Sequence, residues 1–278
     1  MAAGNAALLG VRGIGHLLRY LRLLAVQFRA SLQTSMQYRV DFLVQGAMSF
    51  FWMAWAVVPL LVVYGTRDRV AGWDFDQALV VMGWFLAMKG ALEGAVNPSL
   101  ASVVEHIRKG TLDLVLLKPA DAQFLVSTAK FAPWHVVDVA AGVGVIAWAF
   151  SRLGRAPGPL DVLAALLLTV CAVAVLYSLW ILVVSAAFFV VKVDNLSFLF
   201  LSIFDAARWP VSVFTGFWRF LFTVVIPLAL MTTFPAEALL GRIRPVAVVA
   251  AVAGSLAFVA SARVVWLRAI ARYTSASS

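Results

Sequence analysis

Long uncharged stretches, separated by short polar segments, dominate the hydrophobic pattern of the chain. A helix needs about 20 predominantly apolar residues to cross the hydrocarbon core of a bilayer. The pattern therefore predicts an all-α polytopic membrane protein with about six transmembrane helices. The predicted spans are residues 42–64, 75–96, 131–150, 162–191, 220–234 and 245–266, with Pro227 interrupting the fifth.

The segment before the first span has a different periodicity. In residues 14–40, Leu and Phe side chains recur at helical spacing, while Arg19, Arg22 and Arg29 fall largely on the other face. This pattern predicts a basic amphipathic helix that lies in the plane of the membrane interface. The alternative is a helix outside the membrane that packs against the rest of the protein.

Two further segments do not have the uncharged pattern of a transmembrane helix. Residues 192–219 mix charges with a dense apolar set, and a short charged helix that faced lipid would be costly. We therefore predict an interfacial or protein-covered segment there, with a local salt bridge between Asp205 and Arg208. Residues 235–244 are predicted to form a short re-entrant or surface helix.

The composition excludes a soluble domain. Of the 278 residues, 63% are hydrophobic and 13% are charged, whereas soluble domains have about 45–50% apolar and about 25% charged residues. The net charge of +9 would indicate nucleic acid in a soluble protein, but in a membrane protein it reflects basic residues kept in the cytoplasm. We therefore expect no nucleic-acid partner. With one cysteine, Cys171, and three distant histidines, no metal-ligand spacing is present.

The distribution of Lys and Arg predicts the orientation of the chain. If the N-terminus is cytoplasmic and there are six spans, most basic residues fall in cytoplasmic segments. The basic residues left outside are Arg67, Arg69, Arg152, Arg155, Arg242 and Arg244. By the positive-inside rule, both termini are predicted to face the cytoplasm.

The polar stretch between the second and third predicted spans, residues 97–130, carries the most informative motif. Its segment 104–119 predicts a short amphipathic helix that stops at Gly110, followed by a second short helical segment. Glu105 and Lys109 are spaced to form an ion pair on an exposed face. A charged, rigid element on a small cytoplasmic surface is a natural docking place for a soluble partner. The alternative is an ordinary solvated helix face.

The residues of this stretch resemble the cytoplasmic signature of the permeases of type-2 ABC exporters. The resemblance is carried by Glu105, Arg108, Gly110-Thr111-Leu112, Leu116-Leu117 and Pro119. Their position between the second and third spans agrees with that family, and the layout agrees over nearly the whole chain. Resemblance to one bacterial branch, whose substrates are largely undefined, comes from Arg39-Val40-Asp41-Phe42, Val193-Asp194-Asn195 and Phe234-Pro235-Ala236-Glu237.

This resemblance implies a single transmembrane permease domain over residues 1–278, with an elbow helix at 14–40 and a cytoplasmic coupling loop at 97–130. It implies a multi-pass protein of the bacterial plasma membrane that contacts lipid and pairs with a second permease chain, as a homodimer or a heterodimer. A separate ABC ATPase subunit would bind ATP and Mg²⁺ and dock on the loop and the elbow helix. The residues implied in ATPase coupling are Glu105, Arg108, Lys109, Gly110, Thr111, Leu112 and Pro119.

The chain contains no G-x-x-x-x-G-K-[ST] sequence, the phosphate-binding loop of many ATPases. We therefore expect neither enzymatic activity nor a cofactor in this chain. Two alternatives are an ATP-independent carrier, which should have paired discontinuous helices, and an intramembrane lipid-modifying enzyme, which needs convergent catalytic side chains. The substrate stays open, because an apolar and aromatic pathway suits hydrophobic drugs, lipids and glycolipids alike.

Charged residues inside or beside the spans are the remaining candidates. Lys89 and Glu93 are one helical turn apart and are predicted to form an intramembrane ion pair near the inner end of the second span. Such charges usually mark a transport path or a packed polar contact, but near the interface they can reach water instead. His135 and Asp138, also one helical turn apart, could likewise mark a path or lie at the interface. For them we predict an interfacial position and no proton relay.

Overall fold

The computed structural model describes residues 2–37, 39–189 and 194–272. Within these ranges the chain is helical apart from loops and one isolated bridge between Val70 and Trp73. The α-helices are α1 (Ala2–Gln37), α2 (Arg39–Tyr64), α3 (Phe75–Ala91), α4 (Asn97–Arg108), α5 (Asp113–Leu116), α6 (Ala122–Ser127), α7 (Val136–Leu153), α8 (Pro159–Ala186), α9 (Asp194–Phe204), α10 (Gly216–Phe220), α11 (Phe234–Leu239) and α12 (Pro245–Ala271). The predicted all-α class is confirmed.

Short helical turns of other types continue or join these helices. Those with π-helical hydrogen bonding are η1 (Leu92–Val96), η5 (Leu221–Val225) and η6 (Ala229–Thr233). Those with 3₁₀ hydrogen bonding are η2 (Pro133–His135), η3 (Asp205–Arg208) and η4 (Val211–Val213).

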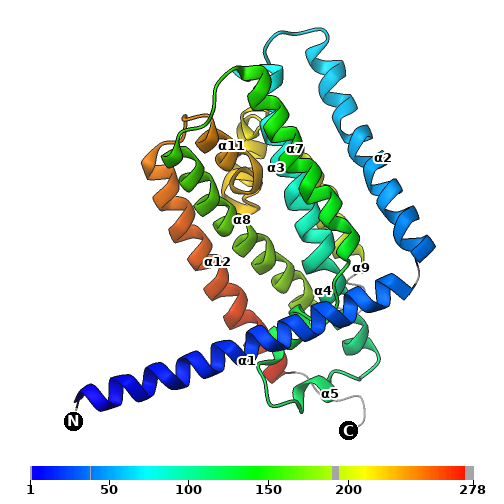
Figure 1. The fold of residues 1–278 in the computed structure, drawn as a ribbon, viewed down its shortest axis with the longest axis vertical. Helices are drawn as coiled ribbons and strands as arrows, with labels where there is room; N and C mark the ends of the chain where they lie inside the picture. Colours follow the sequence, from blue (N-terminus) through cyan, green and yellow to red (C-terminus); the bar gives the residue numbers. More distant parts are fainter. Residues whose placement is uncertain (1, 38, 190–193, 273–278) are drawn as a thin grey trace.

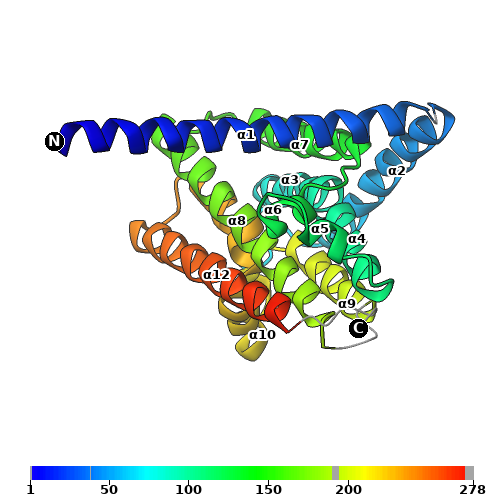
Figure 2. The same ribbon diagram turned by 90° about the horizontal axis from the view of Figure 1, so that it is seen from below.

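The first helix, α1, lies across one end of the helix bundle (Figure 1; Figure 2). We call this end the α1 end, and we call the other, which holds the α2–α3 and α7–α8 connections, the far end. The predicted N-terminal helix is therefore present, but with different bounds. It begins at Ala2 and ends at Gln37, and α2 starts at Arg39, whereas the prediction was 14–40. The residues before position 14 include four alanines and two leucines, which are strong helix formers, and the helix extends through them despite three glycines.

Five helices are long and apolar enough to cross a membrane, and they confirm five of the predicted spans. They are Leu43–Tyr64, Phe75–Arg108, Pro133–Leu153, Pro159–Ala186 and Pro245–Ala271. The second extends beyond its predicted end at Val96, because it continues through η1 and α4 to Arg108. Pro98 is tolerated since it falls in the first turn of α4, directly after a π-helical turn. Residues 97–108, predicted as part of a loop, thus belong to the helix.

The fifth predicted span, residues 220–234, is not a straight crossing helix. Two helical arms, Gly216–Val225 and Ala229–Leu239, are bent by 70° relative to each other. Pro227 lies between the arms and cannot donate a backbone hydrogen bond, which explains the break at this place. The second arm includes α11 and ends at Leu239, so the first half of the short helix predicted at 235–244 belongs to this bent pair.

Both ends of the bent pair lie at the far end of the bundle. Before it, the Ser212 hydroxyl accepts a hydrogen bond from Trp73 Nε1 in the α2–α3 connection, at 3.0 Å. After it, Arg242 donates to Gln77 Oε1 in the first turn of α3, at 2.9 Å. The bent pair is therefore a re-entrant hairpin, which enters the bundle and leaves it at the same end.

The segment α9–η4 carries the chain across the bundle instead. It begins close to the end of α8 (Figure 1) and reaches the far end at Ser212. Phe200 and Phe204 are 6% and 1% exposed, and Phe204 stacks on Phe85 with ring centroids 5.6 Å apart. The protein-covered alternative predicted for this region is thus confirmed for these residues. Residues 190–193, where the fourth predicted span ends, lie outside the described residues.

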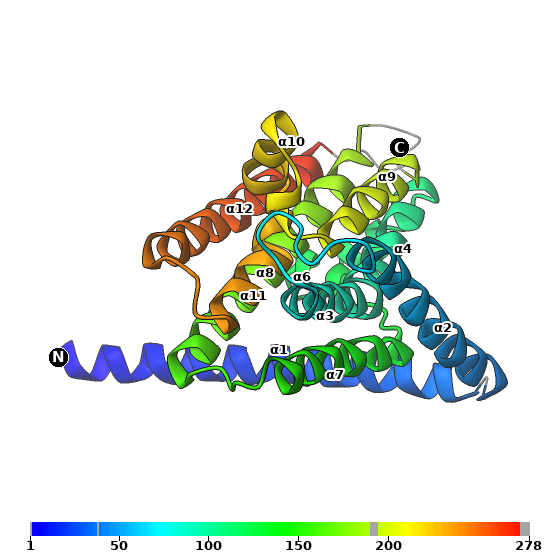
Figure 3. The ribbon, with the colours of Figure 1, turned by 90° about the horizontal axis from the view of Figure 1, so that it is seen from above.

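At the centre of the bundle lies α3, with α7 packed along it (Figure 3). A Cβ added to Gly142 of α7 would lie 2.5 Å from the carbonyl oxygen of Gly83 and 2.7 Å from the amide nitrogen of Ala87. Small residues at such a crossing let two helix backbones approach closely, as membrane proteins favour. By contrast, α2 is little buried. In its most apolar stretch only 6% of the residues are buried, against 56% in the corresponding stretch of the helix Phe75–Arg108.

The glycine contact between α3 and α7 gives a testable prediction. We expect Gly142→Ala to lower the free energy of unfolding by about 1–3 kcal/mol, because the added methyl group forces the backbones apart. Gly144→Ala is the matched control, since nothing lies within 4 Å of its added Cβ. Thermal unfolding of the purified protein in detergent measures both. Equal effects of the two substitutions would contradict the close approach.

Candidate functional site

The predicted coupling residues form a compact element at the α1 end, and we call residues 104–119 the coupling element. Within it, α4 ends at Arg108, and Gly110 adopts a φ of +67°. This left-handed conformation is unfavourable for a residue with a Cβ, so the backbone requires the glycine. The reversal directs the chain into α5.

Thr111, Leu112 and Pro119 fasten the coupling element to its surroundings. The Thr111 hydroxyl lies 2.7 Å from Nδ1 of His106, and the Thr111 amide donates to the His106 carbonyl at 3.0 Å. Leu112 is fully buried and anchors the turn in the apolar core. The Pro119 carbonyl accepts a hydrogen bond from Arg19 of α1 at 2.7 Å. These contacts give Thr111, Leu112 and Pro119 a physical role in holding the turn.

The outer face of the coupling element combines charges with exposed apolar side chains. Glu105, Arg108 and Lys109 are exposed, and Lys109 donates to Glu105 at 2.6 Å, which confirms the predicted pair. Leu114 and Leu117 are 66% and 81% exposed. Adjacent exposed leucines on a polar surface are typical of a protein–protein contact.

The loop after the coupling element is tied to the transmembrane helices. Arg263 of α12 donates to Asp121 at 2.6 Å and to Gln123 at 2.8 Å, and Gln123 donates to Tyr177 of α8 at 3.1 Å. Burial acts to raise the pKa of Asp121, but hydrogen bonds from Arg263 and the Phe124 amide outweigh it and hold that pKa below its usual value. Sequence reasoning missed this network, because Asp121 and Arg263 are far apart in the chain.

The first helix contacts the same region. The Tyr20 hydroxyl accepts a hydrogen bond from the Asp121 amide at 3.1 Å, and its ring meets Phe124 edge-on at 4.7 Å between centroids. Gln27 accepts a hydrogen bond from the Thr128 hydroxyl at 2.5 Å. The coupling element and the loop after it are therefore held by α1, α8 and α12 together.

The Asp121–Arg263 contact can be measured by a double-mutant cycle. We expect Asp121→Asn and Arg263→Gln to show a coupling free energy of about 0.5–1 kcal/mol in thermal unfolding, a modest value because both side chains are partly exposed. Arg268→Gln, an exposed arginine one turn further along α12, is the control. Its effect should add to that of Asp121→Asn without coupling. Full additivity of the Asp121 and Arg263 substitutions would show that the ion pair contributes nothing.

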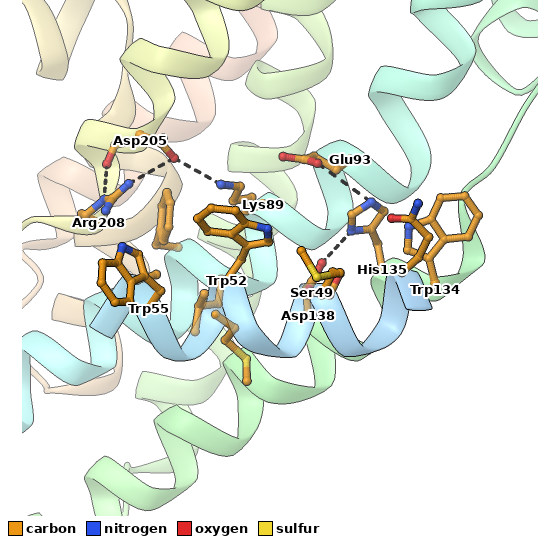
Figure 4. Close-up of a pocket in the computed structure, with 16 residues that line it drawn as sticks. Ser49, Trp52, Trp55, Lys89, Glu93, Trp134, His135, Asp138, Asp205 and Arg208 are labelled. Atoms are coloured by element: carbon orange, nitrogen blue, oxygen red, sulfur yellow. Dashed lines mark hydrogen bonds and ion pairs between the residues drawn. The ribbon is translucent and has the colours of Figure 1, made fainter. Parts of the chain in front are cut away.

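A second candidate site is a cavity of about 720 Å³ lined by residues of α2, α3, η1, α7 and the turns η2 and η3 (Figure 4). Its size falls within the range of about 300–1,000 Å³ usual for small-molecule sites. The turn η2 contributes Trp134 and His135, and α2 contributes Trp52 and Trp55. Among the described residues, no three His, Cys, Asp or Glu side chains are arranged to hold a metal ion.

Lys89 and Glu93 both line this cavity, but the predicted ion pair between them is wrong. Lys89 Nζ lies 3.4 Å from Asp205 Oδ1, and Glu93 lies 3.9 Å from Nε2 of His135. The π-helical turn η1, which begins at Leu92, changes the helical repeat and turns Glu93 away from Lys89. Each charge therefore finds its partner on another element of the bundle.

The charged residues of the cavity form two groups (Figure 4). The cation pole consists of Lys89, Asp205 and Arg208. The acid pole consists of Glu93, His135 and Asp138. The predicted Asp205–Arg208 salt bridge is confirmed at 3.4 Å, and His135 Nδ1 lies 2.6 Å from Asp138. Sequence reasoning named all six residues but missed the long-range contacts that join them.

The comparisons with known proteins agree with this architecture. The family described as "ABC-2 family transporter protein" matches residues 50–277, which is most of the chain. The chain therefore belongs to this family, and it is the membrane-spanning permease component of an ABC transporter. No curated protein and no solved structure matches the chain.

Proposed function

We propose that the chain forms the substrate pathway of an ABC exporter and couples to a separate ATPase subunit that docks on the coupling element. The family generally implies an ABC ATPase partner and a dimeric assembly. ATP and Mg²⁺ would be bound by that partner, because this chain lacks the phosphate-binding loop sequence. The permease chain would contribute a conformational change of its helices, driven by the ATPase.

The exposed apolar face of the coupling element is the observation that carries this proposal. Leu114 and Leu117 are exposed on the same element as the Glu105–Lys109 pair, and the bundle holds this element through Leu112 and Pro119. A docked ATPase would cover these leucines and gain the free energy of burying them. Because Pro119 and Asp121 are bonded to α1 and α12, a push on this face would be passed to the transmembrane helices.

The orientation and the second chain belong to the same proposal. The α1 end would face the cytoplasm of the bacterial plasma membrane, as the distribution of basic residues predicts. A second permease chain, identical or different, would complete the pathway. The little-buried helix α2 offers a surface for that chain or for lipid, with exposed aromatic residues at Phe50, Phe51, Trp52 and Trp55.

The docking surface is tested by Leu117→Glu. We expect this change to lower retention of a co-purifying ABC ATPase subunit by about tenfold, because it places a charge in an apolar contact. Leu160→Glu is the matched control, since Leu160 is 79% exposed but lies at the start of α8, at the far end. It should change retention by less than about twofold. Co-purification from the native membrane measures both, and undiminished retention of the Leu117 variant would place the docking surface elsewhere.

The orientation is tested by cysteine labelling in intact cells. Ala156→Cys, in the exposed α7–α8 connection, should react with a membrane-impermeant maleimide added outside. Lys118→Cys, in the exposed part of the coupling element, should react only after lysis. The one native cysteine, Cys171, is buried and gives a low background. Labelling of Lys118→Cys in intact cells would reverse the proposed orientation.

A further inference from the structure

The cavity between α2, α3 and α7 has an uneven distribution of charge. At the cation pole, Lys89 and Arg208 share a single carboxylate oxygen of Asp205, both at 3.4 Å. Charge-assisted hydrogen bonds are usually shorter, about 2.7–2.9 Å. Two cations facing one carboxylate give this pole an excess of positive charge, which lies over the Phe85 ring at 5.8 Å from Lys89 and 5.5 Å from Arg208.

The acid pole has the opposite imbalance. Glu93 and Asp138 share one imidazole, that of His135, at 3.9 and 2.6 Å. Even if His135 carries a proton, one negative charge is left uncompensated among the described residues. Trp134 lies beside His135 with ring centroids 5.7 Å apart, and a tryptophan face attracts cations, ammonium groups included. The cavity thus presents one site for an anion and one for a cation.

The two poles have a defined order along the bundle. The helix that contains α3 and η1 runs from the far end toward the α1 end, and Lys89 precedes Glu93 by four residues, about one turn. The acid pole therefore lies nearer the surface at the α1 end, and the cation pole lies deeper. In a zwitterionic phospholipid of the leaflet at that end, the ammonium group faces water and the phosphate lies nearer the acyl chains. The order of charges in the cavity matches the order in such a headgroup.

We propose that this cavity binds the headgroup of a zwitterionic phospholipid, with the phosphate at Lys89 and Arg208 and the ammonium group at Glu93, Asp138 and Trp134. The acyl chains would lie along Trp52 and Trp55 of α2, which are each 59% exposed. Charges inside a membrane protein are costly, so a cavity that keeps an excess cation and an excess carboxylate apart favours a ligand that carries both opposite charges. This inference names the substrate class of the proposed permease and so rests on the proposed function.

The test is lipid binding by the full chain, purified in dodecyl maltoside and measured by native mass spectrometry. The probes are phosphatidylethanolamine and phosphatidylglycerol with the same acyl chains, because the second keeps the phosphate but lacks the ammonium group. We expect the wild-type protein to prefer phosphatidylethanolamine by about tenfold, the effect of one charged hydrogen-bonding contact. Equal binding of both lipids, or preference for phosphatidylglycerol, would overturn the proposal without any variant.

Two double variants separate the poles. Glu93→Gln with Asp138→Asn should lower the affinity for phosphatidylethanolamine by about tenfold and leave that for phosphatidylglycerol unchanged or raised. Lys89→Gln with Arg208→Gln should lower the affinity for both lipids. The control is Arg152→Gln, which removes an ion pair with Asp76 outside the cavity and should alter neither affinity. An equal loss of affinity for both lipids in the Glu93 and Asp138 double variant would contradict the assignment of the ammonium group.

A last comparison separates lipid from a soluble zwitterion. Glycerophosphoethanolamine carries the same headgroup without acyl chains, and at equimolar concentration it should not displace the lipid. Displacement would overturn the assignment to lipid. Because lipid binding is measured without the ATPase, and ATPase retention by the Leu117 variant is measured without added lipid, the inference and the proposed function can fail separately.

Discussion

The need to compensate charge inside an apolar bundle determines much of this structure. The central helix α3 carries Lys89, and the turn that continues it carries Glu93. Neither can be left alone where water is scarce. Asp205 is held against Lys89 by the aromatic packing of α9, and His135 faces Glu93 at the start of α7. The placement of η3 and of η2 beside α3 and η1 therefore supplies a partner to each charge, and these residues line the cavity.

Close backbone packing makes this arrangement possible. The glycines at the α3–α7 crossing bring the two helices into direct contact, which sets the distance between Glu93 on η1 and His135 of η2, the residue before α7. On the other side, α2 stays almost free of the bundle, so the cavity has one wall of tightly packed helices and one wall formed by a loosely attached helix. A lipid bound as proposed would have its charges held by the packed helices and its apolar chains placed along the loosely attached helix.

The coupling element and the cavity lie on one continuous helix. From Phe75 to Arg108 the chain runs through α3, η1 and α4 without a loop, and the π-helical turn η1 carries Glu93 of the cavity directly before α4, which leads into the coupling element. Such turns are often found at functional sites because their hydrogen bonding is less regular. A displacement at the coupling element would reach Glu93 through that turn, and the bonds from Asp121 to α12 would pass it to the rest of the bundle.

By itself, the sequence determined the helical membrane class, five of the spans and the motif of the coupling element, because each depends on local properties. Length and hydropathy identify a span, and Gly110 identifies a reversal, whatever the rest of the chain does. Only the tertiary structure decided that Lys89 pairs with Asp205, that residues 216–239 fold back, and that α9 carries the chain across. These outcomes depend on contacts between residues far apart in the chain, whose energies are set by which helices pack together. Periodicity along one segment carries no information about such partners.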